Sequence, residues 1–333
     1  MGCSGAGDPP ASAIPAGRRG DFLRRVACAT TQMSHANLGT IPFDKMRIAN
    51  ARAKRQLATM QPTTIYNTTD GILARRGEDA FLLAGVTMDD IFQQDDPHSW
   101  LEPMLSQGRP VEVPAKLLPP IGSQEVWAAG VTYLRSRDAR MEESKDGGSV
   151  YDRVYAADRP EIFFKATPHR VVGHGGEIRI REDSKWNVPE PEVTLAINRN
   201  GRIFGYTVGN DVSSRDIEGE NPLYLPQAKV YLGCCALGPG LVIREPLPVE
   251  TSIGLRILRA GVEVFSGATS LSQMKRTFPE LAGWLWRDNG FPAGCYLLTG
   301  TGLVPGGDFT LLPGDDVRIA VQHLGELGNI VAA

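Results

Sequence analysis

Short hydrophobic runs recur along the last two thirds of the chain. Most are four to eight residues long and are bounded by Gly, Pro, Asn or Asp, as in EVWAAGV, EIFFKA, EVTLAI, RIFGYTVG, ALGPGLVI, SIGLRIL and DVRIAV. Runs of this length between turn-forming residues are typical of β-strands. We therefore predict that residues 121–333 form a β-rich body, which would be a roll, a barrel or a sandwich.

The clearest helical pattern in this region is SLSQMKRTFPELAGWLWRDNG. Ser270 or Ser272 would cap its start, and the Asn289-Gly290 pair would end it. We predict one helix over this stretch.

The first third of the chain differs in composition and in its hydrophobic pattern. Residues 1–44 are rich in Pro, Gly and small residues and show no period, which predicts a disordered extension. TTIYNTTDGILARRG predicts a hairpin that turns at Asp70-Gly71, while MDDIFQQ and SWLEPMLSQG predict short helices. The proline-rich VPAKLLPPIG reads as a linker. We predict a small N-terminal α/β domain over 45–120 and a second, catalytic β-roll domain over 121–333.

Composition and charge exclude several classes of protein. The chain has 333 residues, 42% of them hydrophobic, and a formal net charge of -3, so it offers no strongly basic face for nucleic acid. It has no apolar run of ~18 residues that would span a membrane. Its five cysteines form no C-x-x-C motif, which argues against a disulfide framework or a thiolate zinc site and favours a reducing, cytoplasmic compartment.

Three acidic residues form the most informative pattern. Glu190 and Glu192 stand two apart at the start of an apolar strand, so both side chains point to one face. Asp211 ends the next apolar run and can add a third carboxylate. Three oxygen donors suit a hard cation such as Mg²⁺, whereas a zinc site would show His or Cys. The alternative is a pair of solvated acids on a strand edge.

Lys229 opens another apolar stretch, QAKVYLGCCALGPG. A lysine in that position is usually a surface residue whose stem lies along apolar neighbours. Beside a bound cation it would instead act as a base near neutral pH, or, when protonated, stabilise an enolate oxygen.

Together these segments resemble a known family. The Glu190-Pro191-Glu192 motif, GYTVGNDVSSRD and the stretch from Lys229 to CCALGP are similar to the metal site of the fumarylacetoacetate hydrolase superfamily, over residues 121–331. The resemblance implies an α+β, mostly β fold: a mixed β-sandwich roll with a small N-terminal domain, assembled as a homodimer or a dimer of dimers. It also implies that Glu190, Glu192 and Asp211 bind Mg²⁺, Mn²⁺ or Ca²⁺, with Lys229 beside the substrate.

One departure from the family bears on the reaction. Its hydrolases typically carry G-x-N-Y-x-x-H, whose histidine activates water, and here Ser136 stands in the place of that histidine. A serine cannot do this unaided near pH 7. TYLRSRDARMEE and TGTGLVP resemble instead the 2-keto-3-deoxy-aldonate dehydratases, the D-arabinonate and D-xylonate branch of the superfamily.

The chemistry of a dehydratase needs an acid and a base but no activated water. Mg²⁺ that is chelated by a 2-keto acid would acidify the C3 protons, and the C4 hydroxyl would then leave. A 2-keto-3-deoxypentonate would give 2-oxoglutarate semialdehyde. Lys229 is the candidate base, and the resemblance implies Glu161 as partner of the C4 hydroxyl. We predict Ser136, Lys165 and Thr301 as substrate-binding residues.

Several alternatives remain open. The chain would be a hydrolase of the C–C bond of acylpyruvates or related 1,3-diketo acids if Glu142 or Glu143 activated water. It would be no enzyme at all if the metal served structure alone. Lys165 would be an outward strand residue, and Arg215 and Asp216 would form a structural ion pair near the site. Cys234 and Cys235 would pack as small hydrophobes.

Overall fold

The computed structural model describes residues 61–134, 149–244 and 246–333, with Ser149 and Val150 described by their backbone alone. All of these residues belong to one unit, Arg55–Ala333. The predicted extension over 1–44 and the predicted site residue Ser136 lie outside the described residues, as do Glu142 and Glu143.

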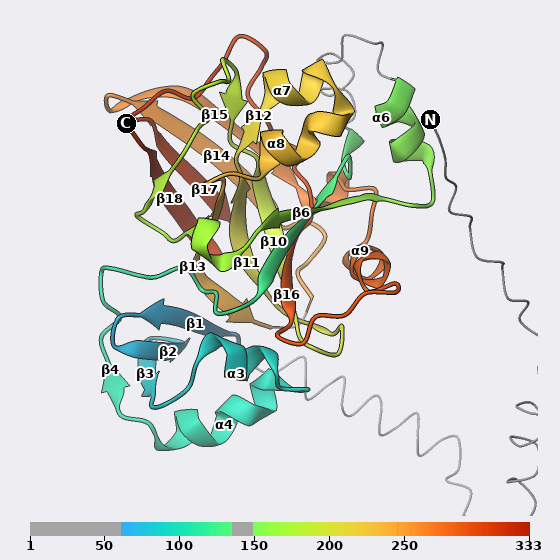
Figure 1. Ribbon diagram of the computed structural model, residues 1–333. Coiled ribbons are helices and arrows are strands. Elements are labelled where there is room, and N and C mark those ends of the chain that lie inside the picture. The colour runs from blue at the N-terminus through green and yellow to red at the C-terminus, as the bar shows by residue number, and fades with distance from the viewer. Residues whose placement is uncertain (1–60, 135–148, 245) are drawn as a thin grey trace, which may run out of the picture. The chain divides into compact units, whose positions relative to one another are not determined.

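The largest sheet runs through the middle of the molecule (Figure 1). Its strands are antiparallel to their neighbours except where β16 meets β5, and β7 (Val171–Val172) pairs in parallel with β13 off the main path. In spatial order the other strands are β4 (Pro110–Val111), β3 (Asp79–Leu83), β2 (Gly71–Arg76), β1 (Thr63–Thr68), β13 (Cys235–Ile243), β11 (Ile203–Asp211), β10 (Pro191–Ile197), β16 (Cys295–Leu298), β5 (Glu125–Gly130) and β6 (Glu161–Ala166).

A second sheet packs on the first. Its strands in spatial order are β15 (Val262–Ser270), β14 (Ser252–Arg259), β17 (Asp316–Val321), β18 (Gly325–Val331) and β8 (Glu177–Ile178). In β17 buried residues alternate with less buried ones, so one face of the strand points into the core. A short third pair consists of β9 (Asn187–Val188) and β12 (Ser213–Ser214).

One hydrophobic cluster joins the two sheets. It contains Val193 and Leu195 of β10 together with Leu255 of β14 and Ile319 of β17. β10 is buried on both faces, including its polar residues Glu192 and Thr194. This arrangement confirms the predicted mostly β, mixed sandwich roll.

The described helices are short and lie at the edges of the sheets (Figure 1). The α-helices are α3 (Met88–Phe92), α4 (Pro97–Gln107), α6 (Ser149–Ala156), α7 (Arg215–Glu220), α8 (Leu225–Lys229) and α9 (Phe278–Leu285). Single 3₁₀ turns are η1 (Pro168–Arg170), η2 (Pro222–Tyr224) and η3 (Leu271–Gln273).

Most predicted elements are present, but the long helix was placed too early. The hairpin of β1 and β2 and the helices α3 and α4 confirm the prediction. The helix expected from Ser270 or Ser272 begins instead at Phe278, because Ser270 still belongs to β15. Thr277 caps it, in a capping box with Glu280.

The N-terminal strands continue the central sheet. β1 pairs with β13 in antiparallel register, with Thr63 opposite Ile243 and Ile65 opposite Leu241. Strands from the predicted domains 45–120 and 121–333 are therefore hydrogen-bonded in one sheet, and the boundary at residue 120 stays a prediction.

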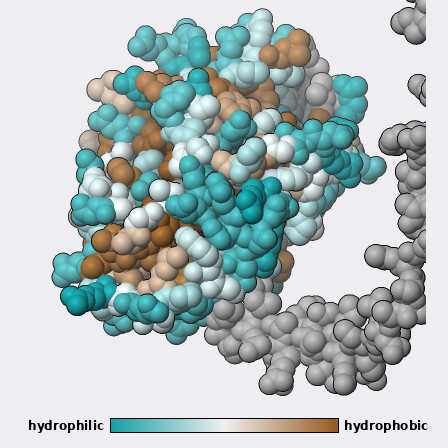
Figure 2. Space-filling model, turned by 60° about the horizontal axis from the view of Figure 1, so that its bottom comes forward, coloured by the Kyte–Doolittle hydropathy of each residue, from teal (hydrophilic) through white to brown (hydrophobic). Residues whose placement is uncertain are grey.

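On the face in Figure 2 hydrophilic residues predominate, with smaller hydrophobic patches among them. In the part of the chain that the structure describes, every helix is too short or too polar to cross a bilayer.

Candidate active site

The pairing of β10 with β11 brings the three predicted acids together. Pro191 lies opposite Asn210 in this antiparallel pair, and the backbone N–H of Asp211 donates to the Glu190 carbonyl at 3.0 Å. Opposite residues of an antiparallel pair share a face, so Glu190, Glu192 and Asp211 all point the same way. The prediction of a shared face is confirmed.

A glycine opposite Glu192 leaves room for the neighbouring side chains. Gly209 lies opposite Glu192, and a Cβ at this position would come within 2.2 Å of Thr194 Oγ1 and 2.3 Å of Leu298 Cδ2. A larger residue would therefore force the neighbours of Glu192 to move.

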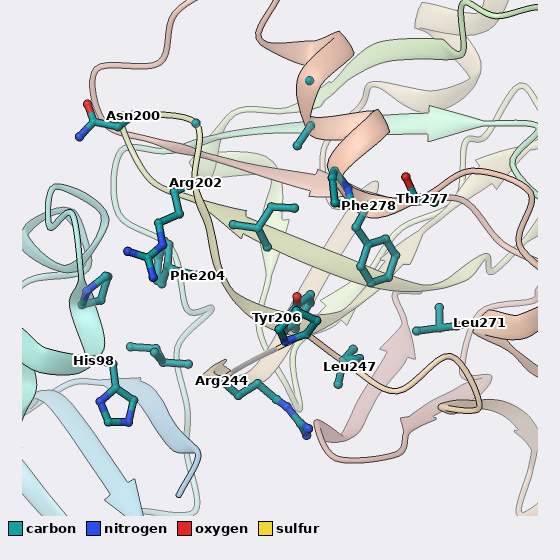
Figure 3. Close-up of a pocket in the computed structure, with 18 of the residues that line it drawn as sticks. His98, Asn200, Arg202, Phe204, Tyr206, Arg244, Leu247, Leu271, Thr277 and Phe278 are labelled. Atoms are coloured by element: carbon teal, nitrogen blue, oxygen red, sulfur yellow. The ribbon is translucent and has the colours of Figure 1, made fainter. Parts of the chain in front are cut away.

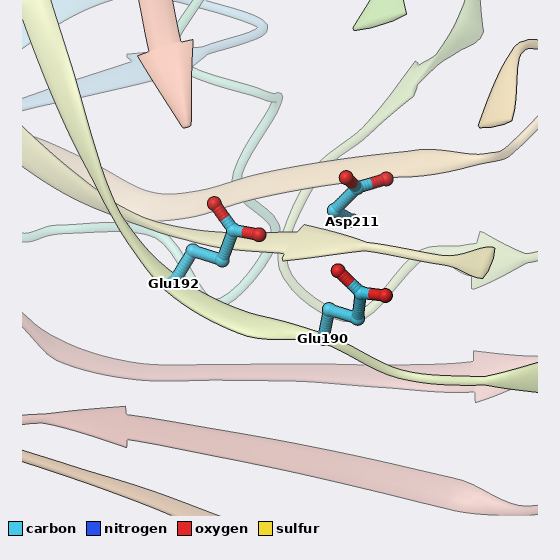
Figure 4. Close-up of side chains that lie close together, drawn as sticks. All are labelled: Glu190, Glu192 and Asp211. Atoms are coloured by element: carbon cyan, nitrogen blue, oxygen red, sulfur yellow. The ribbon is translucent and has the colours of Figure 1, made fainter. Parts of the chain in front are cut away.

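The three carboxylates form a buried cluster, which we call the carboxylate triad (Figure 4). Each offers an oxygen within 4.8 Å of the others, and none of the three side chains is exposed by more than 6%. Burial excludes the alternative of solvated acids on a strand edge. An all-oxygen donor set at this spacing fits Mg²⁺.

Charge repulsion within the triad also favours a bound cation. Burial raises the pKa of Glu192 well above its ordinary value, and the charges of Asp211 and Glu190 raise it further. Lys229 and the backbone N–H of Gly300, which donates to Glu192 Oε2 at 2.6 Å, act in the opposite direction without outweighing them. Negative charge on Glu192 is thus poorly compensated by the protein alone, as a cation site requires.

Lys229 lies against the triad, as predicted. It ends α8, and its buried Nζ lies 3.0 Å from Glu190 Oε2 and 3.0 Å from Asp211 Oδ2. It also donates to the Ser213 hydroxyl, which in turn donates to Glu190 Oε1 at 2.9 Å. The amine is therefore held at the triad and is not an extended surface side chain.

Lys165 lies deeper than the sequence indicated. Its side chain is fully buried in β6, which excludes the alternative of an outward strand residue. Nζ pairs with Asp211 Oδ1 and donates to the backbone carbonyls of Val212 at 3.0 Å and Lys229 at 2.6 Å. Burial acts to lower the pKa of Lys165, but the Asp211 charge, the neighbouring Cys234 and Cys235 and the hydrogen bond to Asp211 together outweigh burial, so the pKa lies above its ordinary value. Lys165 is thus an ammonium that holds Asp211 and the end of α8.

Arg215 and Glu218 belong to the site, and the sequence analysis missed this. Arg215 lies 2.8 Å from Glu190 Oε1, and Asp216 accepts instead from Ser184 and Lys185, which corrects the expected Arg215–Asp216 pair. Glu218 Oε1 lies 3.5 Å from Lys229 Nζ. Their spacing of three residues on α7 was the available signal, since i and i+3 share a helix face.

Glu161 opens β6 beside this cluster. It lines a cavity of about 230 Å³ together with Glu218, Tyr151 and Val154. Gly130 lies opposite Glu161 in the β5–β6 pair, and a Cβ at this position would come within 2.1 Å of Glu161 Oε2. The structure thus places Glu161 and Glu218, which contacts Lys229, at one cavity.

Thr301 follows Gly300, whose backbone N–H contacts the triad, but the Thr301 hydroxyl binds a different partner. Thr301 Oγ1 donates to the Leu303 carbonyl at 3.0 Å, while the preceding Gly300 N–H binds Glu192. Gly300 has a φ of +91°, and a Cβ there would meet Thr132 Oγ1 at 2.0 Å. This tight turn therefore requires glycine.

The cysteines that the structure describes lie in the core. Cys234, Cys235 and Cys295 are free and fully buried, and burial raises the pKa of the Cys235 thiol well above its ordinary value. They pack as small hydrophobes, as predicted.

A larger cavity of about 810 Å³ lies elsewhere, between the start of β11 and helix α9. Figure 3 shows Tyr206, Leu247 and Phe278 around it. Its described lining includes Arg276 but none of the predicted site residues.

Comparison with known proteins identifies the family. The model of the fumarylacetoacetate (FAA) hydrolase C-terminal domain matches residues 126–332. The chain therefore belongs to this family, and the resemblance found in the sequence is confirmed.

Two of the curated relatives are dehydratases. The chain is 46% identical over 217 residues to 2-dehydro-3-deoxy-D-arabinonate dehydratase of Saccharolobus solfataricus, covering 64% of this chain and 73% of the relative. It is 51% identical over 214 residues to a probable 2-keto-3-deoxyxylonate dehydratase of Haloferax volcanii, with the same coverage of 64% and 73%.

A solved structure shares the fold. It is described as a 2-keto-3-deoxy-D-arabinonate dehydratase complexed with magnesium and 2,5-dioxopentanoate, and it superposes with a TM-score of 0.68 at 33% identity. The match covers 82% of this chain and 99% of the other.

Proposed function

We propose that the protein is a hydro-lyase that removes water from a 2-keto-3-deoxypentonate and forms 2-oxoglutarate semialdehyde, the compound also called 2,5-dioxopentanoate. The observation that carries this proposal is the buried triad of Glu190, Glu192 and Asp211 with Lys229 Nζ 3.0 Å from two of its members. The dehydratases similar to this chain support the choice of substrate.

Mg²⁺ is the proposed cofactor, held by the three carboxylates of the triad. When bound, it would polarise the keto group of a 2-keto acid and so acidify the protons on C3. Mn²⁺ and Ca²⁺ accept the same oxygen ligands and would compete for the site.

The charges around the triad favour a substrate with one negative charge. The site contains four buried acidic residues and three buried basic ones. They are Glu190, Glu192, Asp211 and Glu218, and Lys165, Lys229 and Arg215. If all are ionised, a divalent cation changes one excess negative charge into one excess positive charge. The carboxylate of a 2-keto acid then neutralises the site, and buried charges are stable only when so compensated.

Lys229 and Glu161 divide the proton transfers. Once its ammonium has lost its own proton, Lys229 takes a proton from C3, and Glu161 gives a proton to the C4 hydroxyl, which leaves as water so that a double bond forms between C3 and C4. Loss of a C5 proton and its return at C3 then give an enol across C4 and C5. Transfer of the enol hydroxyl proton to C4 gives the aldehyde, so one substrate gives one aldehyde and one water. Lys165, Thr301 and Ser136 are proposed to bind the substrate, with Lys165 also fixing Asp211.

A substrate assay tests the function. The protein with Mg²⁺ should form an aldehyde from 2-keto-3-deoxypentonate, and chelation with EDTA should stop it. Lys229→Ala should lower turnover by about 10²–10⁴-fold, the usual contribution of a positioned base, while Lys116→Ala at an exposed lysine should not. Cleavage of acetylpyruvate without aldehyde formation would instead show a hydrolase. An unchanged rate in Lys229→Ala would show that Lys229 is not the base, and no reaction with either substrate would favour a metal that serves structure alone.

We also propose a setting for the enzyme. It would act in the cytoplasm, in oxidative pentose degradation, as a homodimer or a dimer of dimers. The family resemblance supports the assembly, and the three free, buried cysteines support a reducing compartment. Light scattering coupled to size exclusion tests the assembly, and a mass of 36.1 kDa for the particle would reject it.

A further inference from the structure

We propose that Arg276 is a positioning residue, which holds helix α6 against the cavity of Glu161 and Glu218 and thereby sets the affinity for the substrate. This inference rests on the proposed function, since that cavity is the proposed place of the reacting C4 hydroxyl. Arg276 itself lies in the segment between η3 and α9.

The guanidinium of Arg276 binds the carboxyl end of α6. Its NH1 donates to the Asp158 carbonyl at 2.8 Å, and its NH2 donates to the carbonyls of Ala157 and, at 3.5 Å, Val154. The last carbonyls of a helix have no partner within the helix, and a cation placed there also meets the negative end of the helix dipole.

Arg276 is itself fixed by helix α9. It is 7% exposed, and NH1 lies 2.6 Å from Glu280 Oε1. Glu280 belongs to the capping box that starts α9. Arg276 therefore ties the end of α6 to the start of α9.

The neighbouring Lys275 also contacts α6. Its Nζ donates to the Tyr155 carbonyl and lies over the Tyr155 ring, 4.4 Å from the centroid. Its backbone N–H donates to the Thr132 carbonyl at 2.9 Å. The same short segment thus joins α6 to the chain that leaves β5.

Helix α6 depends on such contacts because it is short. It has eight residues, and isolated helices of that length are not stable in water. Tyr151 and Val154 of α6 line the cavity that also holds Glu161 and Glu218. Loss of the hydrogen bonds from Arg276 would let α6, which forms this wall of the cavity, move.

The expected effect falls on the substrate more than on the metal. Every Arg276 partner named above belongs to α6, to the residues that follow it or to α9. Arg276→Ala should therefore raise KM by about tenfold or more, the scale of losing hydrogen bonds to a charged donor, with a smaller change in kcat and unchanged Mg²⁺ affinity.

Chemical rescue distinguishes the guanidinium from the bulk of the side chain. Arg276 also lines the large cavity of Figure 3, so truncation opens a path from that cavity to the end of α6. Added guanidinium ions should therefore lower the KM of Arg276→Ala and leave the wild-type protein unaffected.

The experiment compares wild type, Arg276→Ala, Arg276→Lys and Arg256→Ala. Arg256 is the matched control, because it also pairs with a glutamate, Glu263, at 2.9 Å but is exposed on the second sheet. Hydrogen exchange of the α6 amides is followed with the kinetics. We expect about tenfold faster α6 exchange and a raised KM in Arg276→Ala, partial recovery in Arg276→Lys, and no change in Arg256→Ala.

Three results would overturn the inference. They are unchanged α6 exchange in Arg276→Ala, an unchanged KM in an active variant, or a loss of Mg²⁺ affinity and melting temperature that accounts for the whole defect. Arg276→Lys keeps the test valid if Arg276→Ala does not fold. A wild-type protein without dehydratase activity would reject the proposed function, and α6 exchange would still decide whether Arg276 holds the helix.

Discussion

At the scale of single residues, Glu192 is the member of the triad whose charge the protein compensates least. Glu190 contacts Lys229 and Arg215, and Asp211 contacts Lys229 and Lys165, whereas Glu192 accepts a hydrogen bond from the Gly300 backbone. A bound cation would supply the missing positive charge. Two predictions follow from this asymmetry.

Glu192→Gln should remove one metal ligand without disturbing the fold, because the two side chains have nearly the same shape. Mg²⁺ affinity should fall by more than about 10-fold, the lower end of the effect of losing an outer-shell partner, and turnover should disappear. Titration calorimetry measures the affinity, with Glu263→Gln at an exposed position as control. Unchanged binding in Glu192→Gln would mean that the cation binds elsewhere.

Mg²⁺ binding should release protons in a pH-dependent way. The raised pKa of Glu192 means that this carboxyl holds a proton over a range of pH in which an ordinary glutamate is ionised. The cation needs the ionised form, so the apparent affinity should rise with pH, by up to about tenfold per pH unit for one proton, and level off above the raised pKa. Calorimetry in buffers of different ionisation enthalpy measures this. A pH-independent affinity with no proton release would contradict the role given to Glu192.

At the scale of elements, short turns position the groups that face the triad. Gly300 lies two residues after the end of β16, has a positive φ and presents its N–H to Glu192, while Thr132 fills the space where a Cβ would lie. α7 and α8 deliver Arg215, Glu218 and Lys229 from one short helical segment after β11. The strands thus supply the acids, and the turns and short helices supply most of the compensating donors.

Gly300→Ala should weaken both the fold and the metal site. The positive φ of this residue costs an L side chain about 1–2 kcal/mol, and the clash with Thr132 displaces the N–H that binds Glu192. Gly314 is the matched control, because its φ is +86° but its Cβ would meet nothing within 4 Å. Both alanine variants should lose stability in urea, and only Gly300→Ala should lose Mg²⁺ affinity. Equal Mg²⁺ affinity in the two variants would contradict this account.

At the scale of the whole molecule, the site lies inside the largest sheet instead of on an exposed loop. β10 and β11 carry the triad, and their residues Val193, Leu195 and Val208 belong to the core shared with the second sheet. Burying like charges in such a core is costly without a counter-ion. The metal should therefore contribute to the stability of the whole fold.

Mg²⁺ should raise the melting temperature of the protein, and EDTA should reverse the rise. A ligand at 100 times its dissociation constant stabilises the folded state by about 2.7 kcal/mol, which corresponds to several degrees for a chain of this size. Differential scanning calorimetry measures the shift. Glu192→Gln should respond less at the same concentration, and an equal response in both proteins would place the stabilising ion away from the triad.

The sequence by itself determined the strands and the three acids of the carboxylate triad. Apolar runs between turn residues predict β10 and β11, and alternation along a strand puts Glu190 and Glu192 on one face. Local signals also predicted the hairpin of β1 and β2, because its turn chemistry acts between neighbours in the chain. The start of α9 was misplaced, since Ser270 is an equally good cap by local criteria and only its pairing in β15 removes it from the helix.

Only the tertiary structure decided which charges surround the triad. The sequence was equally compatible with Lys165 as a substrate-binding residue and as an outward strand residue. It cannot show that Asp211 and two backbone carbonyls enclose the Lys165 ammonium. The spacing of Arg215 and Glu218 places both on one face of α7, but these two residues and Arg276 act on residues that lie far away in the chain or on another element, so local spacing does not identify those partners. Strand periodicity is a property of neighbouring residues, whereas charge compensation in a buried site depends on how separate elements pack.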